Sequence, residues 1–220
     1  MPSVNMPSVH LHPPIAEFIR ERVGEFDLIS PSRKSLLNQL ADYVQSNSPR
    51  NEVGGKGIQL TFLCTHNSRR SHLSQIWAKV AADYYDVSDV TTFSGGTETT
   101  AMNERIVASL ERTGFQIQSP EKTTENPNFL VSYANNAEPL ECFSKVYNEP
   151  PNPSEHYAAI MTCSSADQAC PVVPGCDLRL PIRYEDPKVA DGKANEKATY
   201  DERSRQICRE MLYVMNRVRK

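Results

Sequence analysis

The sequence predicts an α/β protein, a three-layer αβα fold with a central parallel sheet, an N-terminal helical extension and an inserted hairpin. Compact apolar runs typical of buried strands alternate with amphipathic helical patterns after residue 57. Their β-α-β-α-β order favours parallel strands, because parallel neighbours need a crossover connection between them. With 220 residues, of which 39% are hydrophobic, the chain is long enough for one ordinary domain with an appendage.

The first part of the chain carries two helical patterns. One runs over about residues 14–26. The second opens at Ser30 and Pro31, which are a suitable N-cap and a suitable first helical residue. We therefore expect three segments within residues 1–56: a disordered start at the repeated MPSV (1–9), the helical extension, and a linker containing Gly and Pro (46–57).

Residues 57–220 form the predicted main domain. Its expected elements, in chain order, are the strand Ile58–Cys64, the helix Ser71–Tyr85, the strand Val90–Phe93, the helix Met102–Arg112, the strand Phe115–Ile117, the strand Tyr157–Cys163, a strand near Leu178–Ile182 and a helix of about Thr199–Arg217. Residues 119–156 interrupt this order. Two β-like pieces lie there among many Pro and Asn residues, Phe129–Tyr133 and Cys142–Tyr147, and they predict an inserted hairpin.

Composition and charge exclude several classes of function. The 24 Lys and Arg residues against 27 Asp and Glu give a formal net charge of −3, which lacks the basic footprint of a nucleic-acid binder. No apolar run approaches the ~18 residues of a membrane span, and the first residues lack the features of a secretory signal. Six cysteines are too sparse for a disulfide scaffold, so we expect a cytoplasmic protein whose cysteines are catalytic, metal-bound or inert.

The junction after the first predicted strand carries the strongest chemical signal, with the sequence CTHNSRRS from Cys64 to Ser71. A cysteine at the carboxyl end of a parallel strand lies where open α/β sheets bind ligands. The helix N-terminus that follows favours both an anion and the thiolate form of Cys64. Arg70 offers a planar fork that matches a tetrahedral oxyanion, and Ser71 can donate a hydrogen bond to the sulfur. The predicted oxyanion-binding residues are Thr65, His66, Asn67, Ser68, Arg69 and Ser71.

This loop resembles the phosphate-binding loop of low-molecular-weight protein tyrosine phosphatases and of the thioredoxin-coupled arsenate reductases built on that fold. The family pattern C-x5-R-S is matched by Cys64, Arg70 and Ser71. A later C-x6-C-P segment, with Cys163 and Cys170, is similar to the reductase branch. The resemblance, which covers about residues 57–220, implies that Cys64 attacks arsenate, that the second cysteine releases arsenite, and that the third presents a disulfide to thioredoxin.

The same resemblance implies a general acid at Asp186, in the Asp-Pro pair of the loop before the last helix. Glu185 and Asp191 are weaker candidates. Three residues depart from the family pattern: His66 replaces a common Gly, Arg69 replaces a common Cys, and Gln75 replaces a Glu associated with cation binding in some reductases. These departures leave the substrate preference open.

Arsenate reduction is therefore the leading hypothesis, with electrons from a thioredoxin-like dithiol and without a tightly bound cofactor or a metal. The first alternative is a phosphatase that needs only Cys64, Arg70 and Asp186. The second is an oxyanion or phosphopeptide binder without turnover. For Cys163 and Cys170, a zinc site or two unrelated buried cysteines stay open as alternatives. The remaining cysteines, Cys142, Cys176 and Cys208, have no assigned role, although Cys208 fits core packing.

Overall fold

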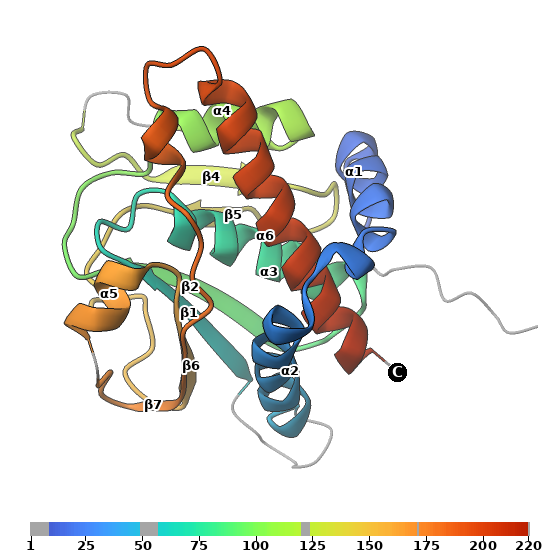
Figure 1. Cartoon of the computed structure of the whole chain (residues 1–220), viewed down its shortest axis with the longest axis vertical. Helices are drawn as coiled ribbons and strands as arrows, with labels where there is room; N and C mark the ends of the chain where they lie inside the picture. The colour runs from blue at the N-terminus through green and yellow to red at the C-terminus, as the bar shows by residue number, and fades with distance from the viewer. Residues whose placement is uncertain (1–8, 49–56, 120–123, 171, 220) are drawn as a thin grey trace, which may run out of the picture.

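A computed structural model of the chain describes residues 9–48, 57–119, 124–170 and 172–219 (Figure 1). The predicted disordered start and most of the predicted linker lie outside the described residues, as does Pro171 of the C-x6-C-P segment. Within the described residues, no helix combines the length and the apolar character needed to cross a membrane.

A four-stranded parallel sheet forms the centre of the fold, in the strand order β2-β1-β6-β7 (Figure 1). The register of β1 with β2 runs without interruption from Ile58↔Val90 to Cys64↔Gly96. The carboxyl ends of these strands therefore meet at one edge, where Cys64 lies. The strands are β1 (Ile58–Cys64), β2 (Val90–Gly96), β6 (Tyr157–Met161) and β7 (Cys176–Leu180).

The expected third parallel strand is not part of this sheet. Instead β3 (Gln116–Gln118) pairs antiparallel with β4 (Phe129–Ser132), which pairs with β5 (Leu140–Cys142) in a separate three-stranded sheet. The prediction was wrong because β3 has only three residues and its two outer residues are exposed, whereas a central parallel strand is buried on both faces. The inserted hairpin exists, but most of the predicted piece Cys142–Tyr147 is irregular, and Val146 only bridges to Gly96.

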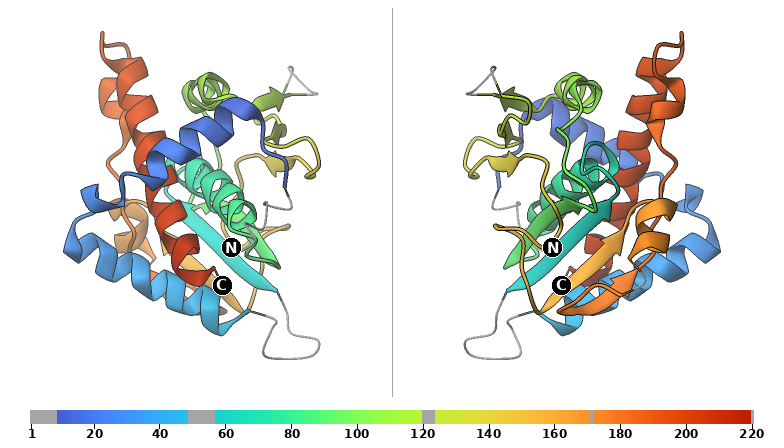
Figure 2. Two further views of the ribbon diagram at one scale, coloured as in Figure 1. Left: turned by 90° about the vertical axis from the view of Figure 1, so that its right-hand side faces the viewer. Right: turned by 90° about the vertical axis from the view of Figure 1, so that its left-hand side faces the viewer.

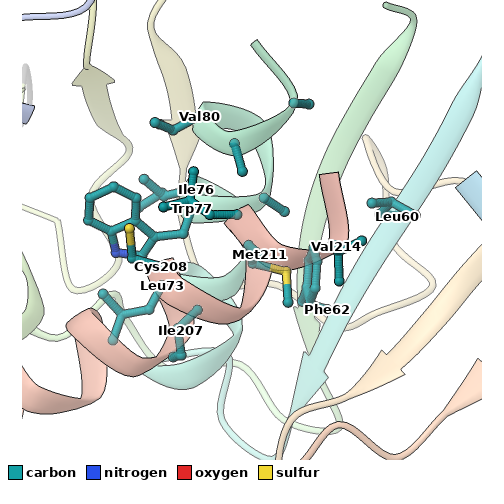
Figure 3. Close-up of a cluster of buried hydrophobic side chains, with 14 of the residues drawn as sticks. Leu60, Phe62, Leu73, Ile76, Trp77, Val80, Ile207, Cys208, Met211 and Val214 are labelled. Atoms are coloured by element: carbon teal, nitrogen blue, oxygen red, sulfur yellow. The ribbon is translucent and has the colours of Figure 1, made fainter. Parts of the chain in front are cut away.

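Helices on one face of the sheet cover the larger part of the core. They are α3 (Arg70–Tyr84), α4 (Glu104–Thr113) and α6 (Glu196–Val218), which agree with the predicted helices to within a few residues. Figure 3 shows side chains of α3 and α6, among them Trp77 and Met211, packed together beside Phe62 of β1. The indole nitrogen of Trp77 donates a hydrogen bond to Ser204 over 2.9 Å, so this large side chain is both buried and satisfied.

The opposite face of the sheet has a thinner cover. Alternate residues of β6, such as Ala159 and Met161, point to a small apolar cluster that also contains Cys64 and Cys163. A short helix that has no counterpart among the predicted elements, α5 (Ser164–Ala169), packs on β1 and β6 at this face (Figures 1 and 2). A helix of six residues is too short to show a helical period in the sequence.

The N-terminal extension consists of α1 (Pro13–Val23), a 3₁₀ turn η1 (Phe26–Leu28) and α2 (Pro31–Ser46). Both helices pack against α6, and their apolar faces join the main core (Figure 2). Ser30 caps α2 as expected, because its side chain accepts a hydrogen bond from the Arg33 backbone N–H over 3.3 Å. The division of the chain at residues 56 and 57 stays a prediction.

Candidate active site

The loop between β1 and α3 surrounds a buried thiol. Cys64 is only 4% exposed, and its Sγ lies 3.1 Å from Oγ of Ser71. The same oxygen accepts a hydrogen bond from Nδ2 of Asn67 over 2.9 Å. Because Asn67 is the donor in that bond, the hydroxyl hydrogen of Ser71 is available to the sulfur. Ser71 is therefore placed to donate a hydrogen bond to the sulfur of the candidate nucleophile.

Asn67 fixes the shape of this loop. It is fully buried, and its φ of 43° is a left-handed conformation that Asn tolerates better than most residues. Its Oδ1 accepts a hydrogen bond from the Lys145 backbone N–H over 3.0 Å. A Cβ on Gly96 would lie 2.8 Å from the Asn67 nitrogen, so only glycine allows β2 to approach the loop this closely. The buried side chain and the backbone conformation of Asn67 thus hold the loop in shape.

Arg70 joins the loop to the predicted acid. Its Nη2 forms a 2.7 Å ion pair with Oδ2 of Asp186, and its Nη1 donates to the Tyr184 carbonyl over 3.1 Å. Among the described residues, the buried Nε of Arg70 has no hydrogen-bond acceptor, which leaves a donor for an oxyanion. Asp186 also caps the 3₁₀ turn η3 (Pro187–Ala190) by accepting from the Lys188 backbone N–H over 3.1 Å. The predicted arginine and the predicted acid are therefore in direct contact.

The two later cysteines lie at opposite ends of α5. Cys163 is the N-cap of this helix: its Sγ accepts a hydrogen bond from the Ala166 backbone N–H over 3.3 Å, and it lies 3.6 Å from Oγ1 of Thr65 in the loop. Cys170 ends the helix and is partly exposed. Burial raises the pKa of the Cys170 thiol, against the effect of the nearby Arg179 guanidinium. Cys163 is thus next to the anion loop, and Cys170 lies at the other end of α5.

Curated proteins and solved structures resemble this chain. The arsenate reductase of Bacillus licheniformis is 27% identical over 145 residues, which are 66% of this chain and 84% of the relative. The arsenate reductase of Bacillus subtilis is 26% identical over 144 residues, with the same shares. A crystal structure of a YwlE mutant from Bacillus subtilis has the same fold, with a TM-score of 0.50 and 12% identity over 74% of this chain and 100% of that one. The chain is thus similar in sequence to curated arsenate reductases, and it has the fold of the YwlE structure. No family model matches it.

Two residues that depart from the superfamily pattern have protein partners. Nε of Arg69 donates to Oη of Tyr200 over 2.9 Å, and its Nη2 lies 3.5 Å from Asp191, which offsets its charge. His66 lies at the exposed rim with its Nε2 3.6 Å from Glu98. Their side chains, and that of Ser68, which donates to the Ala101 carbonyl over 2.7 Å, are thus held by the protein. Direct contact of these three residues with an oxyanion stays a prediction.

The sequence alone did not point to Lys145, whose backbone N–H bonds Asn67 of the loop. Its side chain is buried, and Nζ lies 4.3 Å from the centre of the Phe143 ring and donates to the Phe143 carbonyl over 3.3 Å. Burial lowers the pKa of Lys145. Burial and, next, the Lys145 charge lower the pKa of His72 to about 3, so this imidazole is neutral. No local pattern marks Lys145, because it lies in an irregular segment and reaches the loop only through the fold.

The described residues contain no group of three or more His, Cys, Asp or Glu side chains placed to hold a metal ion. Gln75, at the position associated with cation binding in some reductases, donates to the Thr92 carbonyl over 3.3 Å. Cys142 and Cys208 are fully buried, and burial raises the pKa of Cys142 to about 12 and that of Cys208 well above its ordinary value. Cys208 packs in the core of Figure 3, as expected.

Proposed function

We propose that this protein reduces arsenate to arsenite with the thiolate of Cys64 as nucleophile and a disulfide relay through Cys163 and Cys170. The observation that carries the proposal is the position of Cys163, whose sulfur is 3.6 Å from Thr65, the residue that follows Cys64. A phosphatase needs no second thiol beside the nucleophile. The activity named for the related Bacillus proteins supports the same conclusion.

In the first step, the Cys64 sulfur attacks arsenic, so that a sulfur–arsenic bond forms and an arsenic–oxygen bond breaks. The Arg70 guanidinium and the backbone N–H groups of the loop stabilise the negative charge that develops on the oxygens. Asp186, which touches Arg70 in the structure, is placed to give a proton to the leaving oxygen, so that it departs as water.

In the second step, Cys163 attacks the Cys64 sulfur. A Cys64–Cys163 disulfide forms, the electron pair of the sulfur–arsenic bond passes to arsenic, and arsenic(V) leaves as arsenite, arsenic(III). In the third step, Cys170 attacks Cys163, which frees Cys64 as a thiolate and leaves a Cys163–Cys170 disulfide. A thioredoxin-like dithiol then supplies two electrons, and we place the protein in a reducing compartment such as the cytoplasm.

The third step requires α5 to open. Six helical residues separate Cys163 from Cys170, so at about 1.5 Å of rise per residue their Cα atoms are roughly 10 Å apart. A disulfide needs Cα atoms within about 7 Å of each other. The far end of α5 is held by Arg179, whose Nη2 donates to the Asp167 carbonyl over 2.7 Å and whose Nε donates to the Cys170 carbonyl over 3.0 Å.

Arg179→Met should therefore loosen α5. The two lost backbone hydrogen bonds are worth about 1 kcal/mol each, so we expect the amides of residues 164–170 to exchange with deuterium about 30-fold faster. Hydrogen exchange followed by mass spectrometry measures this change without involving the thiols. Arg183→Met is the matched control, because Arg183 also pairs with the Asp167 carboxylate but, within the described residues, donates no hydrogen bond to the backbone of α5. Equal exchange rates in wild type and Arg179→Met would contradict this role.

Asp186→Asn should remove the proton donor while keeping the size of the side chain. We expect kcat to fall by about 10²- to 10³-fold with arsenate and with the phosphatase substrate p-nitrophenyl phosphate, since general acid catalysis contributes on that order. Steady-state kinetics with both substrates measure it. Glu185→Gln is the control. Glu185 is the exposed neighbour of Asp186, and kcat of this variant should stay within about twofold of wild type. Unchanged kcat in Asp186→Asn would mean that another group donates the proton to the leaving oxygen.

The test of the proposed function is a coupled assay in which thioredoxin and thioredoxin reductase transfer electrons from NADPH. We expect arsenate-dependent consumption of NADPH with release of arsenite. Hydrolysis of p-nitrophenyl phosphate without arsenate reduction would favour the phosphatase, which needs only Cys64, Arg70 and Asp186. Binding of arsenate and phosphate without either reaction would leave the protein as an oxyanion binder.

A further inference from the structure

We propose that Arg33 of the N-terminal extension is a positioning residue for the candidate active site, acting through Tyr184 on Arg70 and Asp186. The proposal rests on the proposed function, because it assigns a role in oxyanion binding at the same site. The N-terminal extension would then support oxyanion binding in addition to packing on α6.

The first link joins Arg33 of α2 to α6. Nε and Nη2 of Arg33 form a two-pronged ion pair with the Glu210 carboxylate, with distances of 3.1, 3.1 and 2.8 Å. The side chains of Arg33 and Glu210 are 17% and 3% exposed, respectively. A planar guanidinium held at two points has a fixed orientation. The buried Glu210 carboxylate therefore sets the plane of the Arg33 guanidinium.

The second link joins Arg33 to Tyr184. The central carbon of the guanidinium lies 4.8 Å from the centre of the Tyr184 ring, within the range of a cation–π contact. Tyr184 is 5% exposed, while its neighbours Arg183 and Glu185 are both exposed. The ring is thus the anchor of this segment, and Arg33 contacts it from the N-terminal extension. Burial raises the pKa of Tyr184 well above its ordinary value, and Glu210 adds to the effect, so the ring stays neutral.

The third link joins Tyr184 to the catalytic groups. The Tyr184 backbone N–H donates to the Thr162 carbonyl over 3.0 Å, and its carbonyl accepts from Arg70 over 3.1 Å. Two residues later, Asp186 pairs with the same guanidinium over 2.7 Å. Residues 181–186 belong to no helix or strand, so their path depends on single contacts such as the Tyr184–Thr162 backbone bond and the packing of the Tyr184 ring. A shift of the Tyr184 ring would move both partners of Arg70.

Arg33→Met tests the role, because it keeps an apolar cover over the ring but removes the planar charge. A misplacement of about 1 Å can cost up to about 10²-fold, so we expect kcat/KM for p-nitrophenyl phosphate to fall by about 10- to 100-fold. A second readout does not depend on turnover. Inorganic phosphate should protect Cys64 from alkylation by iodoacetamide, and we expect the phosphate concentration for half protection to rise about tenfold in the variant.

The control is Arg22→Met on α1. Arg22 is also buried, pairs with Glu21 and Glu25, and lies over the ring of Phe18 at 4.6 Å, but that ring belongs to the extension itself. Both variants should lose thermal stability, and only Arg33→Met should lose phosphate protection and kcat/KM. Equal losses in the two variants, or wild-type protection and kinetics in Arg33→Met, would overturn the proposal.

Arg33→Lys keeps the result decisive if Arg33→Met does not fold. Lysine retains a charge for Glu210 but lacks the fork, so an intermediate loss of phosphate protection is expected, and wild-type protection would overturn the proposal. The two proposals can fail separately. A wild type that does not reduce arsenate contradicts the proposed function, whereas phosphate protection of Cys64 still reports how Arg33 acts on Arg70.

Discussion

Cys64→Ser should abolish arsenate reduction, with kcat lower by at least about 10⁴-fold, since the loss of a catalytic nucleophile has an effect on that order. A serine hydroxyl is not ionised at neutral pH and cannot form the sulfur–arsenic bond or the disulfide that follows it. The coupled thioredoxin assay measures the loss of arsenate turnover. Hydrolysis of p-nitrophenyl phosphate should fall in parallel, because it requires the same nucleophile.

Cys176→Ser is the matched control for the nucleophile. Cys176 is partly exposed and begins β7, and burial raises the pKa of its thiol. The variant should reduce arsenate within about twofold of wild type, as expected for a substitution outside the site. Arsenate turnover that survives in Cys64→Ser would remove the loop thiol from the mechanism.

Cys163→Ser and Cys170→Ser should separate the two chemistries of the site. We expect each to lower multiple-turnover arsenate reduction by about 10³-fold or more, because residues that act as one relay fail together. Hydrolysis of p-nitrophenyl phosphate should stay within about threefold of wild type. The first substitution is structurally mild, since serine is a good N-cap and can replace the sulfur that accepts from Ala166.

The same two variants also test the alternatives. If both reactions fall together, the thiols are needed for the structure of the loop, and the relay is wrong. Unchanged arsenate turnover in both variants would also contradict the relay. A wild type that hydrolyses p-nitrophenyl phosphate but reduces no arsenate would favour the phosphatase, which needs neither Cys163 nor Cys170.

The parts of the site that could be predicted from sequence are those with a local signal. The strand Ile58–Cys64 has the bounds that its apolar run predicted, and the loop of Cys64 and Arg70 follows it at the start of α3. A buried parallel strand and a helix N-terminus impose strong constraints within a few residues of each other. Asp186 was chosen as the acid from its order along the chain and the resemblance to known enzymes, and its contact with Arg70 is seen only in the structure.

The parts that could not be predicted depend on tertiary contacts. β3 fits the strand pattern, but its pairing with β4 rather than the central sheet is decided by the fold. α5 is too short to show a period, and its end is held by Arg179 from β7. The contact of Arg33 with Tyr184 joins residues far apart in the chain, and neither stands out by itself. Contacts of this kind leave no local pattern in the sequence from which they could be predicted.

Disulfide mapping after a single turnover shows whether three thiols act as a relay. Reduced full-length protein is incubated with arsenate without thioredoxin, free thiols are then alkylated, and the disulfides are located by mass spectrometry. We expect one arsenite per protein molecule, a Cys163–Cys170 disulfide and a free Cys64. Arsenite formed without a disulfide, or with a disulfide that excludes Cys163, would contradict the relay.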